Sequence, residues 1–211
     1  MLRGEIPEEE LHAIDPRAFK PTSLTYDETW VGEKTEDVVK GVLRHEIGHA
    51  NNTDYLLMIK GQRMARNDGY LPTSYMSAWN AIEDLWVNNR EMRDSDLVRR
   101  QMTELYRDYL PKVIEELKSG KSTLVRQFGM RATLQWAKDE FGIVDQATLD
   151  MLDNGVLDAR AVQAFQNIRD SYRKFIDPRS SASENFRTMS SEIWPIVKGL
   201  ELEELTDEMI K

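Results

Sequence analysis

The sequence predicts a mainly α-helical fold (α+β) with one small β-hairpin near the N-terminus, and three observations support this class. After residue 73, apolar side chains recur at helical spacing almost without interruption. Only residues 22–31 combine strand-favouring Thr, Tyr, Trp and Val with a pair that can turn the chain, Asp27-Glu28. Glycines stand where helices commonly end, at Gly120, Gly142, Gly155 and Gly199.

A short helix is expected around residues 8–14. The first long helix is expected over about residues 35–50, because Thr35 is a suitable N-cap and Glu36 and Asp37 follow it in the first turn. The acidic tail from Glu201 onward is expected to fray. Pro111 is expected to separate two helices, because proline breaks a helix interior. The helices after the first long helix are expected at about residues 55–64, 73–93, 96–109, 111–118, 122–141, 146–153, 158–176 and 184–198.

Composition bounds the class of protein. The 211 residues are 40% hydrophobic, which is enough for a real core. A dispersed net charge of -9 argues against nucleic acid as the main partner. The chain has no cysteine, a polar N-terminus and no apolar run as long as a membrane span, so we expect a cytoplasmic protein with no membrane partner.

The chemistry-bearing pattern is His-Glu-x-x-His at residues 45–49. Residues four apart share one helix face, so His45 and His49 can reach the same metal ion, and Glu46 can act on a metal-bound water. Imidazole suits Zn²⁺, and a catalytic zinc keeps three protein ligands and one open position. Gly48 is unfavourable inside a helix, which indicates close packing there. The alternative is an amphipathic helix with two half-exposed histidines.

A third ligand is expected on the helix over residues 73–93. Glu83 and Asp84 are adjacent carboxylates in a segment rich in tryptophan and aliphatic residues. Because burying an unpaired charge is costly, such a pair needs a partner. The alternative is that both acids face solvent, and the pattern alone does not choose between them as ligands.

Residues 45–54, HEIGHANNTD, followed by residues 80–88, NAIEDLWVN, resemble the gluzincin metallopeptidases. The resemblance is closest to the small members often found beside von Willebrand A domains, including cobalt-chelatase-like proteins, and it covers about residues 20–95. The sequence departs from the family pattern at Asn51-Asn52 and at Val87-Asn88.

The resemblance implies a zincin-like metallopeptidase domain in residues 1–95, joined to a helical part in residues 96–211 that packs with it as one domain. It implies one Zn²⁺, and the family's ligand and catalytic residues correspond to matching positions of this sequence. His45, His49 and Glu83 would be ligands, Glu46 the general base, and Asp84 or Asn80 would orient a histidine.

The implied reaction is metal-assisted hydrolysis of a peptide bond in a peptide or protein substrate, with a von Willebrand A-type domain or protein as a possible partner. An oxyanion donor is expected among Tyr70, Tyr75 and Tyr106. The hairpin offers an edge to an extended peptide. The alternatives are a zinc-binding pseudo-enzyme, against which an intact Glu46 argues, and a metal-free helical scaffold module of a larger assembly.

Overall fold

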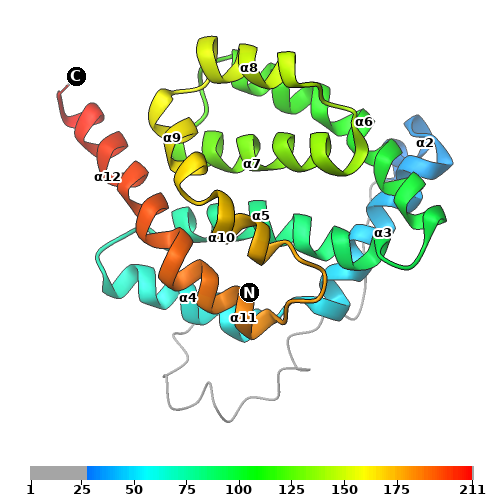
Figure 1. The fold of residues 1–211 in the computed structure, drawn as a ribbon, viewed down its shortest axis with the longest axis horizontal. Coiled ribbons are helices and arrows are strands. Elements are labelled where there is room, and N and C mark those ends of the chain that lie inside the picture. Colours follow the sequence, from blue (N-terminus) through cyan, green and yellow to red (C-terminus); the bar gives the residue numbers. More distant parts are fainter. Residues whose placement is uncertain (1–27, 211) are drawn as a thin grey trace.

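Helices make up the part of the chain that the computed structural model describes, residues 28–210, with side chains described as far as residue 202 (Figure 1). No strand occurs among these residues, so the mainly α-helical class is confirmed for them. In chain order the elements are α2 (Glu28–Glu33), α3 (Glu36–Asn52), α4 (Tyr55–Asn67), α5 (Pro72–Met92), α6 (Asp96–Lys118), α7 (Leu124–Phe141), α8 (Gln146–Gly155), α9 (Ala159–Asn167), α10 (Arg169–Phe175), α11 (Ala182–Thr188), a π-helical turn η2 (Met189–Ile193) and α12 (Trp194–Ile210).

The hairpin predicted at residues 22–31 is wrong for its second half, because residues 28–31 lie in α2. Residues 22–27, and the short helix expected around residues 8–14, fall outside the described residues. The strand preference of Thr29, Trp30 and Val31 is an intrinsic tendency of about 1 kcal/mol or less, which context readily reverses. Glu28 in the first turn suits a helix N-terminus.

Most of the other helices agree with the sequence-based boundaries, with three exceptions. Pro111 lies inside α6 and does not end it. Leu110 and Val113 are buried on either side of the proline, so packing of both halves offsets the lost hydrogen bond. The helix expected over 158–176 is divided at Ile168, and Gly199 lies within α12.

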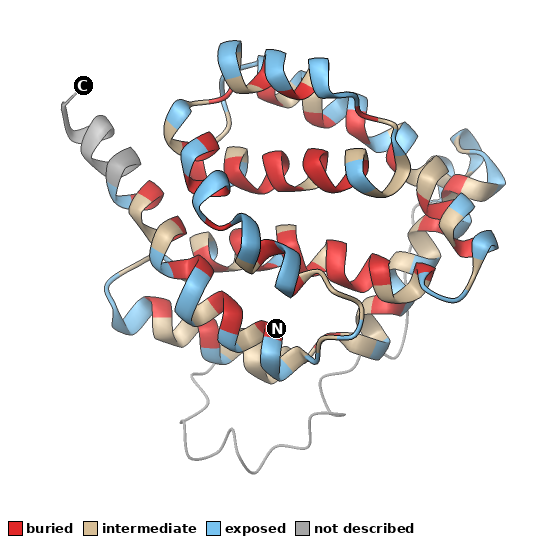
Figure 2. Ribbon diagram, in the orientation of Figure 1, coloured by how far each residue is buried: buried red, intermediate tan, exposed pale blue. Residues whose placement is uncertain are grey.

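The core lies around α5 and α7, which pack side by side at the centre of the molecule (Figures 1 and 2). Their buried side chains include Trp79, Trp86, Phe128 and Trp136. One cluster of buried apolar residues extends from α4 to α12, so residues before and after 95 share a single core. The boundary at residue 95 stays a prediction. Among the described helices, none has the length and apolar character needed to cross a membrane.

Helix α3 stands at the edge of this core and approaches its neighbours closely at two glycines. A Cβ atom added at Gly41 would lie 2.6 Å from the carbonyl oxygen of Gln101 on α6. One added at Gly48 would lie 2.5 Å from Cγ1 of Val87 on α5 and 2.9 Å from Cγ of Glu91. The close packing expected at Gly48 is therefore confirmed, and it holds α3 against the acidic part of α5.

Candidate metal centre

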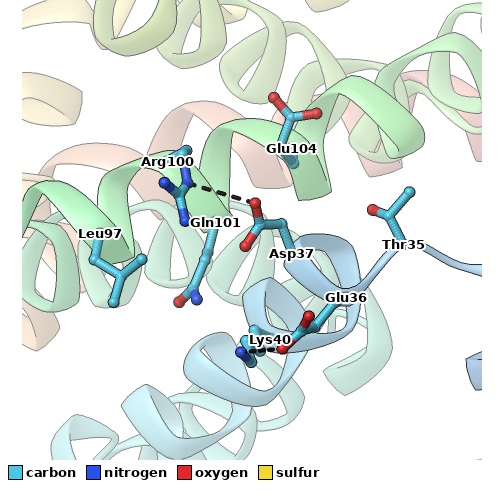
Figure 3. A pocket seen from close by; sticks show the side chains of 8 residues that line it. All are labelled: Thr35, Glu36, Asp37, Lys40, Leu97, Arg100, Gln101 and Glu104. Carbon is cyan, nitrogen blue, oxygen red and sulfur yellow. Dashed lines mark hydrogen bonds and ion pairs between the residues drawn. The ribbon is translucent and has the colours of Figure 1, made fainter.

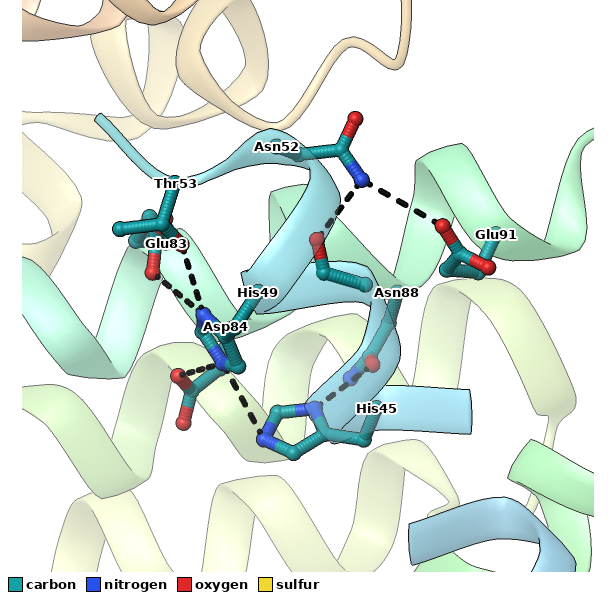
Figure 4. Close-up of polar contacts among 9 residues, drawn as sticks. His45, His49, Asn52, Thr53, Glu83, Asp84, Asn88 and Glu91 are labelled. Atoms are coloured by element: carbon teal, nitrogen blue, oxygen red, sulfur yellow. Dashed lines mark hydrogen bonds and ion pairs between the residues drawn. The ribbon is translucent and has the colours of Figure 1, made fainter. Parts of the chain in front are cut away.

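The two histidines of the motif project from one face of α3 (Figure 4). Thr35 caps the helix by accepting from the backbone N–H of Val38, and the helix continues unbroken past both histidines. The rings of His45 and His49 meet edge to face with centroids 4.6 Å apart, and their Nε2 atoms are 3.3 Å apart. The two nitrogens that could bind a metal therefore point at one spot.

Asp84 reaches that spot from α5, because its Oδ1 lies 3.2 Å from Nε2 of His49. One ligand atom from each of His45, His49 and Asp84 lies within 4.8 Å of the others. Tetrahedral zinc with bonds of about 2.0–2.1 Å separates neighbouring ligand atoms by about 3.3–3.4 Å. The separations of 3.3 Å and 3.2 Å agree with two edges of such a tetrahedron, so these residues fit a zinc ion.

Asn88 holds His45 from behind. Nδ1 of His45 lies 2.9 Å from Oδ1 of Asn88, and because an amide oxygen only accepts, Nδ1 carries the hydrogen. The Asn88 amide nitrogen donates to the Tyr106 hydroxyl at 2.9 Å, and both residues are buried. These two hydrogen bonds fix the tautomer of His45 in which Nε2 has a free lone pair.

Glu83 holds His49 in the same way. Its Oε2 lies 3.0 Å from Nδ1 of His49, and its Oε1 accepts from the hydroxyl of Thr53. The Thr53 oxygen lies 2.9 Å from the same Nδ1, so the ring N–H has two acceptors. Glu83 is only 2% exposed, which excludes the alternative of an ordinary solvent-facing acid.

The two adjacent acids therefore stand in the opposite relation to the sequence-based expectation. Glu83, expected as the third ligand, lies behind His49, whereas Asp84, expected to orient a histidine, lies beside Nε2. Consecutive helical residues point about 100° apart, so the two acids contact opposite nitrogens of the His49 ring, and only Asp84 lies on the Nε2 side.

The site is strongly acidic around His49. Burial alone would lower the pKa of His49, but hydrogen bonds to Asp84 and Glu83, together with the charges of both acids, raise this pKa to about 10. Without a metal, His49 therefore carries a proton at neutral pH and pairs with both carboxylates.

The other expected residues lie around this centre. Glu46 is exposed on α3 directly after His45. Asn80 is exposed one turn before Asp84, and it makes no hydrogen bond to either histidine. Burial raises the pKa of Tyr55, at the start of α4, and the charges of Glu83 and Glu46 raise it further, which puts this hydroxyl in the field of both acids.

Two of the three tyrosines expected as oxyanion donors pack against α12, and the third contacts Asn88 behind His45. Tyr70 and Tyr75 pack against Trp194 of α12, and Tyr75 is fully buried. Tyr106 accepts from Asn88 behind His45. The expectation of Tyr70, Tyr75 or Tyr106 as the oxyanion donor therefore has no support in this arrangement.

Sequence reasoning assigned no role to Thr53 or Asn88, although helix spacing carries a signal for both. Thr53 follows His49 by four residues, and its backbone N–H caps α3 by donating to the His49 carbonyl. Asn88 follows Asp84 by four residues and therefore shares its face of α5. A polar side chain one helical turn from a metal ligand is close enough to hydrogen-bond to the Nδ1 atom of a ligating histidine.

A cavity of about 540 Å³ lies elsewhere, between the first half of α3 and α6 (Figure 3). It contains none of the expected site residues. Each of its charged side chains has an ion-pair partner. Asp37 pairs with Arg100 at 3.4 Å, Glu36 with Lys40, and Glu104 with Arg107, which does not line the cavity.

The chain matches no family model, and comparisons with curated proteins and with solved structures find no match either.

Proposed function

We propose that this protein is a zinc-dependent metallopeptidase in which His45, His49 and Asp84 hold the ion and Glu46 is the general base. One observation is the main support for the proposed zinc site. Nε2 of His49 lies 3.3 Å from Nε2 of His45 and 3.2 Å from Oδ1 of Asp84, and all three residues offer ligand atoms within 4.8 Å of one another, while both Nδ1 atoms are already held from behind. Acceptor atoms at such distances repel one another unless a cation or a proton lies between them.

Zinc is the metal that this donor set favours. Two imidazoles and one carboxylate are ligands of catalytic zinc sites, and three protein ligands leave one position open. A zinc ion bound there would supply a Lewis acid that polarises a carbonyl and lowers the pKa of water to about 7.

The side chains around the ion have separate roles. Glu46, exposed beside His45, takes the proton of the attacking water and passes it to the leaving amine. Glu83 and Thr53 fix the ring of His49, and Asn88 fixes the ring of His45, so that both Nε2 lone pairs point at the ion. The choice of a peptide bond as substrate is inferred from the His-Glu-x-x-His pattern, in which the glutamate directly follows the first ligand.

The first test is zinc stoichiometry. Wild type should bind one zinc, and His49→Ala and Asp84→Asn should lose it. Glu83→Gln keeps a hydrogen-bonding group behind His49 and should bind zinc about 10- to 100-fold more weakly. The matched control is Glu91→Gln, because Glu91 lies on the same helix and contacts Asn52 rather than a histidine. If Glu83→Gln empties the site and Asp84→Asn does not, Glu83 is the ligand.

The second test separates an enzyme from a zinc-binding scaffold. Zinc-loaded Glu46→Gln should keep its metal and fold but lose about 10²- to 10⁴-fold of its activity on a peptide library. Glu36→Gln is the control, because it changes an exposed glutamate in the first turn of the same helix. A fully zinc-loaded wild type that cleaves nothing would favour the scaffold, and a Glu46→Gln variant as active as wild type would refute the mechanism.

A further inference from the structure

A groove of about 210 Å³ opens directly beside the proposed metal centre, between α5, α6 and α7. Asp84 is one of its lining residues, and Asn80 and Ser77 continue the same face of α5 away from the histidines at helical spacing. We call it the Tyr109 groove. It is lined by Ser77, Asn80, Ala81, Asp84, Tyr106, Tyr109, Val113, Arg126, Gly129, Met130 and Thr133.

The volume of the groove suits one amino-acid side chain. Pockets that enclose whole small-molecule ligands usually measure about 300–1,000 Å³, and this groove is smaller. It is open to solvent, because Asn80, Tyr109 and Arg126 are exposed at its rim. A chain bound across the metal centre could therefore place one side chain in it.

The walls of the groove favour an uncharged side chain. Tyr106 and Tyr109 meet edge to face with ring centroids 6.0 Å apart, and the buried side chains of Val113 and Met130 add apolar surface. Both charged residues of the lining already have a partner. Arg126 donates from Nε and, at 2.8 Å, from Nη2 to the carboxylate of Glu116, and Oδ1 of Asp84 lies 3.2 Å from Nε2 of His49. A substrate carboxylate would have to compete with that bidentate pair.

Tyr109 and Asn80 are the side chains most available to a ligand. Tyr109 is 44% exposed, so its ring is accessible to a ligand that enters the groove. Asn80 makes no side-chain hydrogen bond to any described residue, so its amide is available to donate to and accept from a peptide main chain.

We propose that the Tyr109 groove binds an aromatic or long aliphatic side chain of the substrate, next to the bond that is cleaved. The placement of this side chain next to the cleaved bond rests on the proposed peptidase function. The preference for an uncharged side chain rests on the pairing of Arg126 with Glu116 and of Asp84 with His49. Tyr109 supplies the aromatic contact, and Asn80 holds the adjacent main chain.

The first measurement uses the metal-free protein and no catalysis. N-acetyl amides of phenylalanine, leucine, glutamate and lysine are titrated into wild type, Tyr109→Ala and Met151→Ala, and binding is followed by NMR. Met151 is the matched control, because it is 45% exposed on α8 and does not line the groove. We expect the phenylalanine and leucine amides to bind most tightly, and Tyr109→Ala to weaken the phenylalanine amide by about 2- to 10-fold.

The second measurement reads cleavage positions in a peptide library with zinc-loaded protein. Tyr109→Ala should reduce the preference for aromatic and aliphatic side chains at one position beside the cleaved bond, and Met151→Ala should not. If the library is cleaved but neither amide binding nor this preference depends on Tyr109, the groove assignment is refuted and the peptidase stands. If the amides bind as expected but nothing is cleaved, the groove stands as an apolar side-chain site and the peptidase proposal fails. Tighter binding of the glutamate amide would refute the proposed substrate class.

Discussion

Metal binding at this site should release a proton from the protein, even well above neutral pH. His49 lies between Asp84 and Glu83, and its pKa is raised to about 10. A zinc ion needs the lone pair of Nε2, so this nitrogen must lose its hydrogen before it can become a ligand. An ordinary histidine, with a pKa near 6.5, would already be neutral at pH 8.

The size of the effect follows from that pKa. With a value of about 10, the protonated form of His49 outnumbers the neutral form by about 10³ at pH 7 and about 10 at pH 9. Zinc should therefore bind about tenfold more tightly for each pH unit, or about 100-fold from pH 7 to pH 9. With an ordinary histidine the same rise would change the affinity less than about twofold.

The assay is a competition between metal-free protein and a chromophoric chelator at pH 7, 8 and 9, with free zinc buffered. Calorimetry in two buffers of different ionisation enthalpy should count about one proton released per zinc at pH 8. Glu83→Gln removes one of the two charges that hold the proton, so the rise in affinity should level off at lower pH. An affinity that is flat between pH 7 and pH 9 would refute the assigned protonation of His49.

Three further substitutions test the surrounding structure. Gly48→Ala places a methyl group 2.5 Å from the stiff side chain of Val87, so it should destabilise the protein by about 1–3 kcal/mol and weaken zinc binding, as measured by thermal unfolding and chelator competition. Asn88→Ala should weaken zinc binding about 10- to 100-fold at unchanged stoichiometry. An unchanged affinity would show that zinc binding does not depend on the hydrogen bond between Asn88 and the His45 ring. Asp153→Ala leaves buried Arg131 without its bidentate partner, at 2.6 and 2.9 Å, and should cost about 3–5 kcal/mol in urea unfolding.

Much of the fold could be predicted from local signals. Helix α3 was expected over residues 35–50 and spans Glu36–Asn52, because the Thr35 cap and the acidic first turn act within a few residues. Where tertiary packing decides, the prediction failed. Pro111 is accommodated inside α6 because buried residues on both sides hold the helix to the core.

The choice between Glu83 and Asp84 shows why the site was only partly predictable. The motif identified His45 and His49 because their spacing is a property of one helix. Which of two adjacent acids faces them depends on how α5 is rotated about its axis. Helix α5 buries polar residues such as Glu83, Asn88 and Asn89 together with its apolar ones, so the positions of its polar residues do not give that rotation uniquely. The rotation is set by contacts with the adjacent helices α4 and α6 and also with α3, α7 and α12, which are more distant in sequence.

The position of α3 outside the apolar core has a consequence for its dynamics. The buried residues of α3 are Val38, Gly41 and Gly48, and none of them belongs to the core cluster. Its attachment to α5 therefore depends on close backbone approach and polar contacts, which suits a segment that opens by itself while the core stays folded. An ion shared between the two helices would oppose this opening by mass action.

At a free zinc concentration of about 100 times the dissociation constant, this opposition amounts to about 2.7 kcal/mol. We expect amide hydrogen exchange in α3 to slow by up to about 100-fold when zinc binds, and exchange in α7 to stay unchanged. The helix that carries two of the proposed ligands would then be the part of the molecule whose order reports the presence of the metal.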